Sequence, residues 1–357
     1  MKRSHILIIA CVIGIVIISG VFIIEFNKMA FHTSVSLGTN QTSNEPTLVN
    51  SDTRNFSKPI VEQIMSHSQI PQLLGLTDHI LSFHDWSRDG RFIIAASPAV
   101  ILHFNGTTLE KLSTLPITSH YAFRISPSGK YVLFSGERHN SDGSVSSNLY
   151  LYDIHGNTTN QITNNTRNDS DYRHTTYQYY GWVSDQNIIY SEENDFPLPK
   201  YFGSANTSLW LADYTGKKIK LMCHDISSSA PNFTNSHESC FFGWDMDISS
   251  DGKKIAFDAF PGIGIYNIDT NQTARIGPNV PIFWDIISPQ WIPNSEMMEF
   301  SYMPGENPPR IGIMSSDGHF YKQISGEYGG TPIVSPDGKY ILFTDMDGNI
   351  MRISFEK

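Results

Sequence analysis

The chain has 357 residues and a formal net charge of −10, with 17% charged and 12% aromatic residues. The negative charge, with no basic stripe to interrupt it, disfavours a nucleic-acid partner. The sequence also lacks a Gly-x-x-x-x-Gly-Lys-Ser/Thr loop, a His-Glu-x-x-His motif and a dinucleotide fingerprint, so it carries no signature of a nucleotide-binding protein or a zincin.

The first segment has the pattern of a membrane anchor. Residues 6–24 carry no charge and follow Lys2 and Arg3. At 1.5 Å per residue a helix of this length spans a hydrocarbon core of about 30 Å. The flanking cations predict that residues 1–5 lie in the cytoplasm and that the rest of the chain is extracytoplasmic. A cleaved signal peptide and a lipoprotein acylated at Cys11 are the alternatives.

Residues 25–67 are predicted to form a flexible stalk. From His32 to Pro59 the sequence is rich in Ser, Thr and Asn and has almost no hydrophobic periodicity, so it cannot bury a core. The remainder, residues 68–357, is predicted to be one domain because a single motif repeats along it.

The repeat consists of an apolar residue, a turn rich in Ser, Pro, Asp and Gly, and a short β run. Its six copies begin at Trp86, Ile125, Trp182, Ile248, Trp291 and Val334. Pro presets φ in such turns, and Asp, Asn and Gly tolerate the left-handed conformation. Repeats about 40–65 residues long, made of β-branched and aromatic runs with Asn-Gly and Asp-Gly turns, indicate a propeller rather than a helical solenoid. We therefore predict an all-β, six-bladed propeller of four-stranded blades.

The last blade is incomplete at the C-terminus. After the hairpin at Asp347-Gly348, residues 349–357 provide only one more strand. In a closed propeller the N-terminal part of the domain supplies the missing strand, which removes exposed sheet edges. The sequence places this strand at residues 68–76, paired with residues 350–355.

Two groups of residues bear on an extracytoplasmic location. Nine Asn-x-Ser/Thr sequons predict a glycoprotein in a host with the machinery, although an Asn-, Ser- and Thr-rich chain gives several by chance. They lie at Asn40, Asn55, Asn105, Asn157, Asn164, Asn168, Asn206, Asn232 and Asn271. Cys223 and Cys240 are predicted to form a disulfide in an oxidising compartment. Two reduced core cysteines are the alternative, and a zinc site is disfavoured because the spacing fits no standard ligand pattern.

The form Ser-Pro-Asp-Gly-Lys-x-Ile-x-Phe, complete at Ser335 to Phe343 and echoed at Ser126 to Phe134 and at Ser249 to Phe257, resembles the blade motif of TolB-type six-bladed propellers. The resemblance covers the propeller but not the small α/β domain of TolB, in whose place this chain has the predicted anchor and stalk. It implies a propeller scaffold and binding of a protein or peptide over the mouth of the axial channel. The chain has no Gly-x-Ser-x-Gly nucleophile elbow, which argues against a prolyl-oligopeptidase-like peptidase.

Polar residues precede the repeated turns and are expected on the innermost strands, which line the axial channel. This candidate binding site comprises His84, Asp85, His120, Arg124, Tyr180, Asp245, Asp247 and Asp285. Converging carboxylates there would suit Ca²⁺ or the basic group of a peptide. Polar side chains also cost little in a wet channel, so the alternative is that the site binds nothing.

The sequence therefore predicts a single-pass cell-membrane protein whose propeller binds a surface protein or peptide, without catalysis and without a required cofactor. The alternative is a metal-assisted lyase or hydrolase that acts on envelope polysaccharide through His84, Asp85, His120 and Arg124.

Overall fold

The computed structural model describes residues 59–74, 81–96, 99–117, 122–139, 145–164, 175–176, 180–195, 205–225, 246–258, 262–276, 283–304 and 308–355. All of them belong to one compact unit, Asn50–Lys357. No helix formed by these residues is long and apolar enough to cross a membrane. The predicted anchor at residues 6–24 lies outside the described part of the chain.

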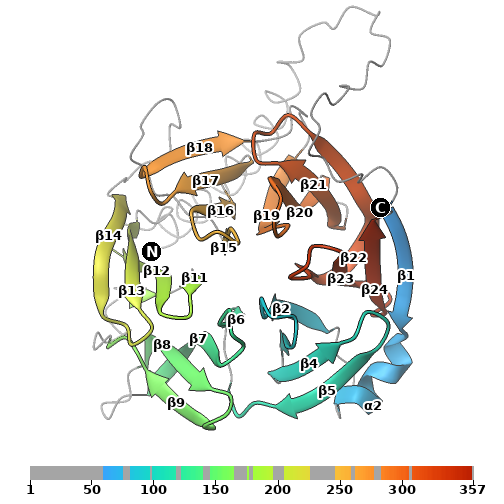
Figure 1. Cartoon of the computed structure of the whole chain (residues 1–357), viewed down its shortest axis with the longest axis horizontal. Coiled ribbons are helices and arrows are strands. Elements are labelled where there is room, and N and C mark those ends of the chain that lie inside the picture. Colours follow the sequence, from blue (N-terminus) through green and yellow to red (C-terminus); the bar gives the residue numbers. More distant parts are fainter. Residues whose placement is uncertain are drawn as a thin grey trace, which may run out of the picture. The chain divides into compact units, whose positions relative to one another are not determined.

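The described strands form a β-propeller with four-stranded blades arranged around an axis (Figure 1). The first blades are β2(Ser82–Trp86), β3(Ile93–Ala96), β4(Val100–Phe104) and β5(Leu109–Thr114), then β6(Phe123–Ile125), β7(Tyr131–His139), β8(Val145–Asp153) and β9(Thr158–Gln161). Next come β10(Thr175–Thr176), β11(Tyr180–Ser184), β12(Asn187–Asp195), β13(Ala205–Asp213) and β14(Lys218–Asp225), then β15(Met246–Ile248), β16(Lys254–Asp258), β17(Ile263–Asn267) and β18(Gln272–Ile276). The last strands are β19(Phe283–Trp291), β20(Met297–Pro304), β21(Arg310–Ser315), β22(Tyr321–Val334), β23(Tyr340–Asp345) and β24(Ile350–Phe355).

The six copies of the motif correspond to five hydrogen-bonded sheets among the described residues, because β22 takes part in two sets of strands. Its first half pairs with β21, and its second half, from Tyr328 to Val334, pairs with β23. The result is one seven-stranded sheet in the order β1-β24-β23-β22-β21-β20-β19. The innermost strands β2, β6, β11, β15, β19 and β22 contact one another in a closed circuit.

The ring closes through an N-terminal strand, although not the one that the sequence predicts. β1(Pro59–Met65) pairs antiparallel with β24, with Val61 opposite Ile353 and Glu62 opposite Arg352. Figure 1 shows the two strands side by side, blue against dark red. Within the predicted strand at residues 68–76, the described residues up to 74 instead form a short helical turn, η1(His67–Gln69) followed by α2(Ile70–Leu74). The closing strand thus lies within the predicted stalk, residues 25–67, so the propeller begins before residue 68.

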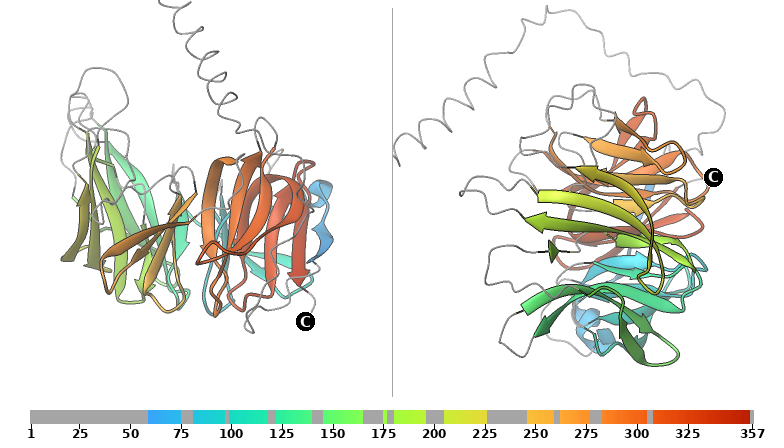
Figure 2. Two further views of the ribbon diagram at one scale, coloured as in Figure 1. Left: turned by 90° about the horizontal axis from the view of Figure 1, so that it is seen from above. Right: turned by 90° about the vertical axis from the view of Figure 1, so that its left-hand side faces the viewer.

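The apolar core lies between neighbouring blades. Figure 2 shows the blades from two further sides, with their strands stacked one beside another. Successive side chains of a strand point to opposite faces of its sheet, so the two faces of a blade pack against different neighbouring blades. The blade β2–β5 supplies Phe83, Ile93 and Leu102 to a cluster that also contains Ile333 and Leu342 from the strands on the other side of the closure. Ile70 and Leu74 of α2 pack into the same cluster, which explains why this segment is apolar without being a strand.

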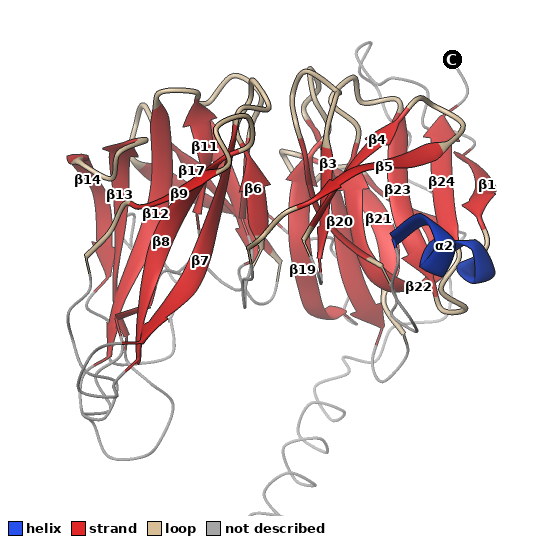
Figure 3. Cartoon of the chain, turned by 90° about the horizontal axis from the view of Figure 1, so that it is seen from below, coloured by secondary structure: helices blue, strands red, loops and turns tan. Residues whose placement is uncertain are grey.

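Side chains stabilise the repeated turns through hydrogen bonds with one another and with backbone N–H groups. In the first turn the Ser87 hydroxyl donates to Asp89 Oδ1 at 2.7 Å, the Arg91 N–H donates to the same oxygen at 3.0 Å, and Gly90 has φ 77°. The Ser-x-Asp hydrogen bond recurs at Ser249 and Asp251, at Ser335 and Asp337 and, in a turn outside the six copies, at Ser315 and Asp317. Tan segments in Figure 3 show described turns gathered at one end of the propeller, which we call the tight-turn face.

The lowered pKa values of carboxyl groups in the turns predict that the protein loses stability in acid. The hydroxyls of Thr215, Ser249 and Ser315 lower the pKa of Asp213, Asp251 and Asp317, the last to about 2. The pKa of a carboxyl group in the unfolded chain is about 4. A carboxyl group whose pKa is lower in the folded protein stabilises the fold when the pH is above about 4, and this stabilisation is lost as the pH falls through the lower, folded pKa. Urea midpoints should therefore fall between about pH 4 and pH 2. The variant with Asp213→Asn, Asp251→Asn and Asp317→Asn should show a flatter curve, and an unchanged slope would refute this assignment.

Candidate binding site at the propeller axis

A cavity of about 370 Å³ lies at the axis, lined by residues from all the inner strands. Those that belong to the strands themselves include Phe83, His84, Asp85, Arg124, Gly181, Trp182, Met246, Asp247, Gln290, Trp291, Thr331 and Val334. At the end formed by the tight-turn face, the lining consists of Arg88, Pro127, Ser250, Pro293, Asn294 and Pro336. We call this end the tight-turn mouth.

Asp85 and Asp247 occupy equivalent positions, and each joins two neighbouring inner strands. Asp85 Oδ1 accepts the N–H of Trp86 at 2.8 Å and Oδ2 accepts the N–H of Ile125 in β6 at 2.7 Å. Asp247 repeats this with Ile248 at 2.8 Å and with Trp291 in β19 at 2.7 Å. Both carboxylates therefore stabilise the ring itself.

Gln290 plays the same role at the next junction. Its Oε1 accepts the N–H of Val334 in β22 at 3.1 Å, and its Nε2 donates to the carbonyl oxygen of Pro332 at 2.6 Å. The sequence analysis did not select Gln290. Alignment of the repeats would have found it, because it immediately precedes Trp291 as Asp85 precedes Trp86.

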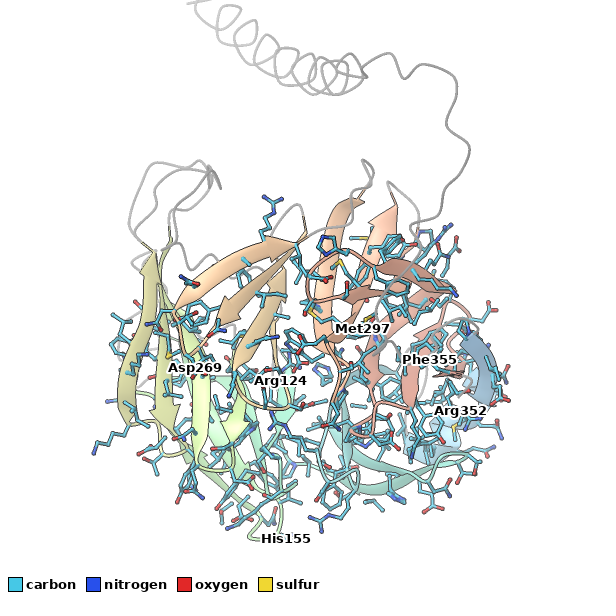
Figure 4. The ribbon with its side chains drawn as sticks, turned by 45° about the horizontal axis from the view of Figure 1, so that its top comes forward. Arg124, His155, Asp269, Met297, Arg352 and Phe355 are labelled. Atoms are coloured by element: carbon cyan, nitrogen blue, oxygen red, sulfur yellow. The ribbon has the colours of Figure 1, made fainter. Side chains whose placement is uncertain are left out.

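Arg124 reaches from β6 to two other inner strands and lies near the centre of the ring (Figure 4). Its Nη1 donates to the carbonyl oxygen of His84 at 2.8 Å, and its Nη2 donates to that of Met246 at 3.4 Å. The corresponding position in the next blade is Gly181, which has no side chain to compete for the space. A single guanidinium thus links β2, β6 and β15.

One cation at the axis, Arg124, faces two carboxylates, Asp85 and Asp247. Burial raises the pKa of Asp85 to about 6, opposed by the positive charge of Arg124 and by the hydrogen bonds from Ile125 and Trp86. Burial also raises the pKa of Asp247, opposed by its hydrogen bond from Trp291 and by Arg124. Asp85, Arg124 and Asp247 are half-buried, and the positive charge of Arg124 offsets part of the cost of burying the two carboxylates.

The structure brings together part of the predicted site. His84, Asp85, Arg124 and Asp247 line the cavity. Asp285 lies in β19 opposite Met303, but its side chain is not described. His120 and Asp245 lie outside the described residues, as does Cys240, and of Cys223 only the backbone is placed, opposite Leu209.

Tyr180 does not reach the cavity. Its side chain is buried between blades, where its hydroxyl donates to the Ala122 carbonyl and accepts the N–H of Ser135 at 3.0 Å. His84 holds the equivalent position in its own blade, yet a register irregularity between Phe83 and Asp85 lets Phe83 take the core position and leaves His84 at the cavity.

The carboxylates do not form a metal site as far as the chain is described: no three His, Cys, Asp or Glu side chains come together among those residues. Asp85 and Asp247 already accept two backbone N–H groups each. The predicted Ca²⁺ therefore has no ligand set that the described side chains supply.

Comparison with known proteins addresses the fold. No protein-family model matches the sequence, and no curated protein matches it significantly. Solved structures with this fold include TolB propellers. The structure of a putative TolB from Agrobacterium tumefaciens is 17% identical with a TM-score of 0.50, covering 79% of this chain and 92% of that one.

Two other matches are more distant. TolB from Acinetobacter baumannii is 13% identical with a TM-score of 0.46, and covers 82% of this chain and 68% of its own. An oligogalacturonate lyase from Vibrio parahaemolyticus is 13% identical with a TM-score of 0.44, and covers 75% and 76%. At these identities the likeness concerns the architecture alone.

Proposed function

We propose that the chain is a non-catalytic binding protein whose six-bladed propeller holds a segment of a surface protein or a peptide at the tight-turn mouth. The count of six blades is supported by β22, which pairs with β21 through its first half and with β23 through its second half. The seven-stranded sheet can therefore be divided into two four-stranded blades that have β22 in common. The circuit of six inner strands supports it as well. Placement on the extracytoplasmic side of a membrane is proposed from the charge pattern around residues 6–24 alone.

The axial cavity is the observation that carries this proposal. Inner strands that lie far apart in the sequence converge only there, so it is the place where many blades can address one ligand together. Deep in the cavity, the polar side chains of Asp85, Asp247 and Gln290 are already engaged in the hydrogen bonds that hold the ring together. Recognition is therefore assigned to the mouth, where Arg88, Ser250, Pro293 and Pro336 meet solvent.

Selection from a phage-displayed random peptide library on the immobilised full-length protein tests this proposal. Peptides that bind the wild type should lose about tenfold or more in affinity for Ser250→Trp, which places a large side chain in the mouth. Ile219→Trp is the matched control, because Ile219 is exposed on the outer strand β14. If Ile219→Trp weakens binding and Ser250→Trp does not, recognition lies on the outer surface.

The alternative of a metal-assisted lyase or hydrolase requires a different arrangement. It needs a metal held near His84 and Asp85 with ligands from residues such as His120. No described contact favours it, so it stays a prediction from the sequence. Turnover of an acidic polysaccharide by the purified protein, abolished by Asp85→Asn in a folded variant, would establish it.

A further inference from the structure

A second hollow opens beside the tight-turn mouth, along the junction between the first blade and the blade that β1 closes. We call it the seam groove. It is lined by Trp86, Arg88, Asp89, Gly90, Phe104, Asn105, Gly106, Ser335, Pro336, Asp337, Lys339 and Tyr340. Trp86, Arg88 and Pro336 also line the axial cavity. The two hollows therefore adjoin each other at these three residues.

The floor of the seam groove is apolar and aromatic. Trp86 and Phe104 pack edge to face at 5.9 Å between ring centroids, and Phe104 packs edge to face with Tyr340 at 6.1 Å. The Trp86 indole N–H already donates to the carbonyl oxygen of Gly90. Trp86 and Phe104 are themselves buried, so the apolar contact that the groove offers comes from the half-buried Tyr340 and Pro336.

The charges along the groove leave one cation available. Asp89 is paired with Arg91 at 2.5 Å and Asp337 with Lys339 at 2.7 Å, each within its own turn. Arg88 forms no ion pair with any described residue. Its guanidinium extends over the mouth, where Nη1 and Nη2 lie 3.5 Å from the carbonyl oxygens of Ser250 and Trp182.

Such long hydrogen bonds to neutral acceptors are weak and readily exchanged. A carboxylate would accept two parallel hydrogen bonds from the same guanidinium, and charge assistance makes each of them stronger. Arg88 also stands where the other five copies of the turn have Pro127, Ser184, Ser250, Pro293 and Pro336, so the turn geometry does not require an arginine.

We propose that the tight-turn mouth and the seam groove together bind an extended peptide, with an acidic side chain or C-terminal carboxylate on Arg88 and an apolar side chain a few residues away against Tyr340 and Pro336. This rests on the proposed function and specifies the partner of that site. An acidic oligosaccharide fits less well, because sugars stack on exposed ring faces. Trp86 is only 9% exposed and Phe104 only 5%.

Binding of a positional-scanning hexapeptide library to the full-length protein tests the proposal. The wild type should prefer Asp or Glu at one position and a large apolar residue a few positions away. Arg88→Met keeps the length of the side chain but removes its charge, and it should lose the acidic preference together with about tenfold or more in affinity. Lys253→Met is the matched control, since Lys253 holds the position of Arg91 in another copy of the turn, is exposed and lies outside both hollows.

Each outcome is decisive, provided that the two variants keep the melting temperature of the wild type. Library binding without an acidic preference, or an equal loss in Arg88→Met and Lys253→Met, overturns the inference and leaves the proposed function standing. Tighter binding of oligogalacturonate than of any hexapeptide also overturns it. If no hexapeptide and no phage-displayed peptide binds, the proposed function fails as well.

Discussion

Replacing Arg124 by Met should destabilise the propeller by about 3–5 kcal/mol, the usual cost of removing one partner of a buried charge pair and leaving the other charge uncompensated. The substitution removes a positive charge that opposes the burial of both Asp85 and Asp247, although Arg88 also contributes at Asp247. It also removes the donors to the carbonyl oxygens of His84 and Met246. Chemical denaturation at pH 7 measures the loss.

The pH dependence of that loss separates charge from packing. Without the guanidinium, the folded pKa of Asp85 should rise above its value of about 6. A buried carboxyl group with a raised folded pKa destabilises the fold least when it is protonated. The difference in the free energy of unfolding between the wild type and Arg124→Met should therefore shrink as the pH falls from 7 towards about 4. A difference that stays constant would point to lost packing instead.

Arg88→Met provides the comparison for this experiment. Arg88 is exposed, and its hydrogen bonds within the described part of the chain are the two at 3.5 Å. Its loss should therefore change the free energy of unfolding by less than about 1 kcal/mol. If both substitutions cost the same, Arg124 does not hold the ring together.

Removing β1 should have the second large effect. A protein that begins at residue 66 lacks the six paired positions between β1 and β24, whereas one that begins at Pro59 keeps them. At about 0.5–1.5 kcal/mol for each of roughly six hydrogen bonds, the shorter protein should lose about 3–9 kcal/mol, a large part of the stability of an ordinary domain. It should also self-associate, because β24 becomes an open edge.

Thermal unfolding and sedimentation of the two truncated proteins check this expectation. Ile64 and Met65 also pack against the first core cluster, so their loss adds to the effect. The account of ring closure is wrong if the protein that begins at residue 66 melts at the same temperature as the longer one and stays monomeric.

The turns were the most predictable feature because their geometry is local. Ser, Asp and Gly within a few residues supply the hydroxyl, the carboxylate and the left-handed backbone that the turn needs, as in Ser335, Asp337 and Gly338. The strands that follow were predicted from the same pattern. The closing strand was misplaced because Ile70 and Leu74 form an apolar run as short as a strand, and a run of that length does not distinguish a helical turn from an edge strand.

The site was predictable only in part, for a tertiary reason. Proximity to the turn selects the inner strand but not the face on which a side chain lies, so Tyr180 was included although it packs between blades. A local irregularity in β2 changes the face on which His84 lies. The reach of Arg88 across the mouth and the adjoining seam groove depend on blades that are distant in the sequence, and no spacing reveals them.

Hydrogen exchange of the full-length protein, with and without a peptide selected from the library, tests the binding mouth most directly. We predict slower exchange of backbone amides in the turns around Arg88, Ser250 and Pro336, which belong to different blades, and no change in β14. Slower exchange confined to the outer strands of one blade would contradict recognition at the tight-turn mouth.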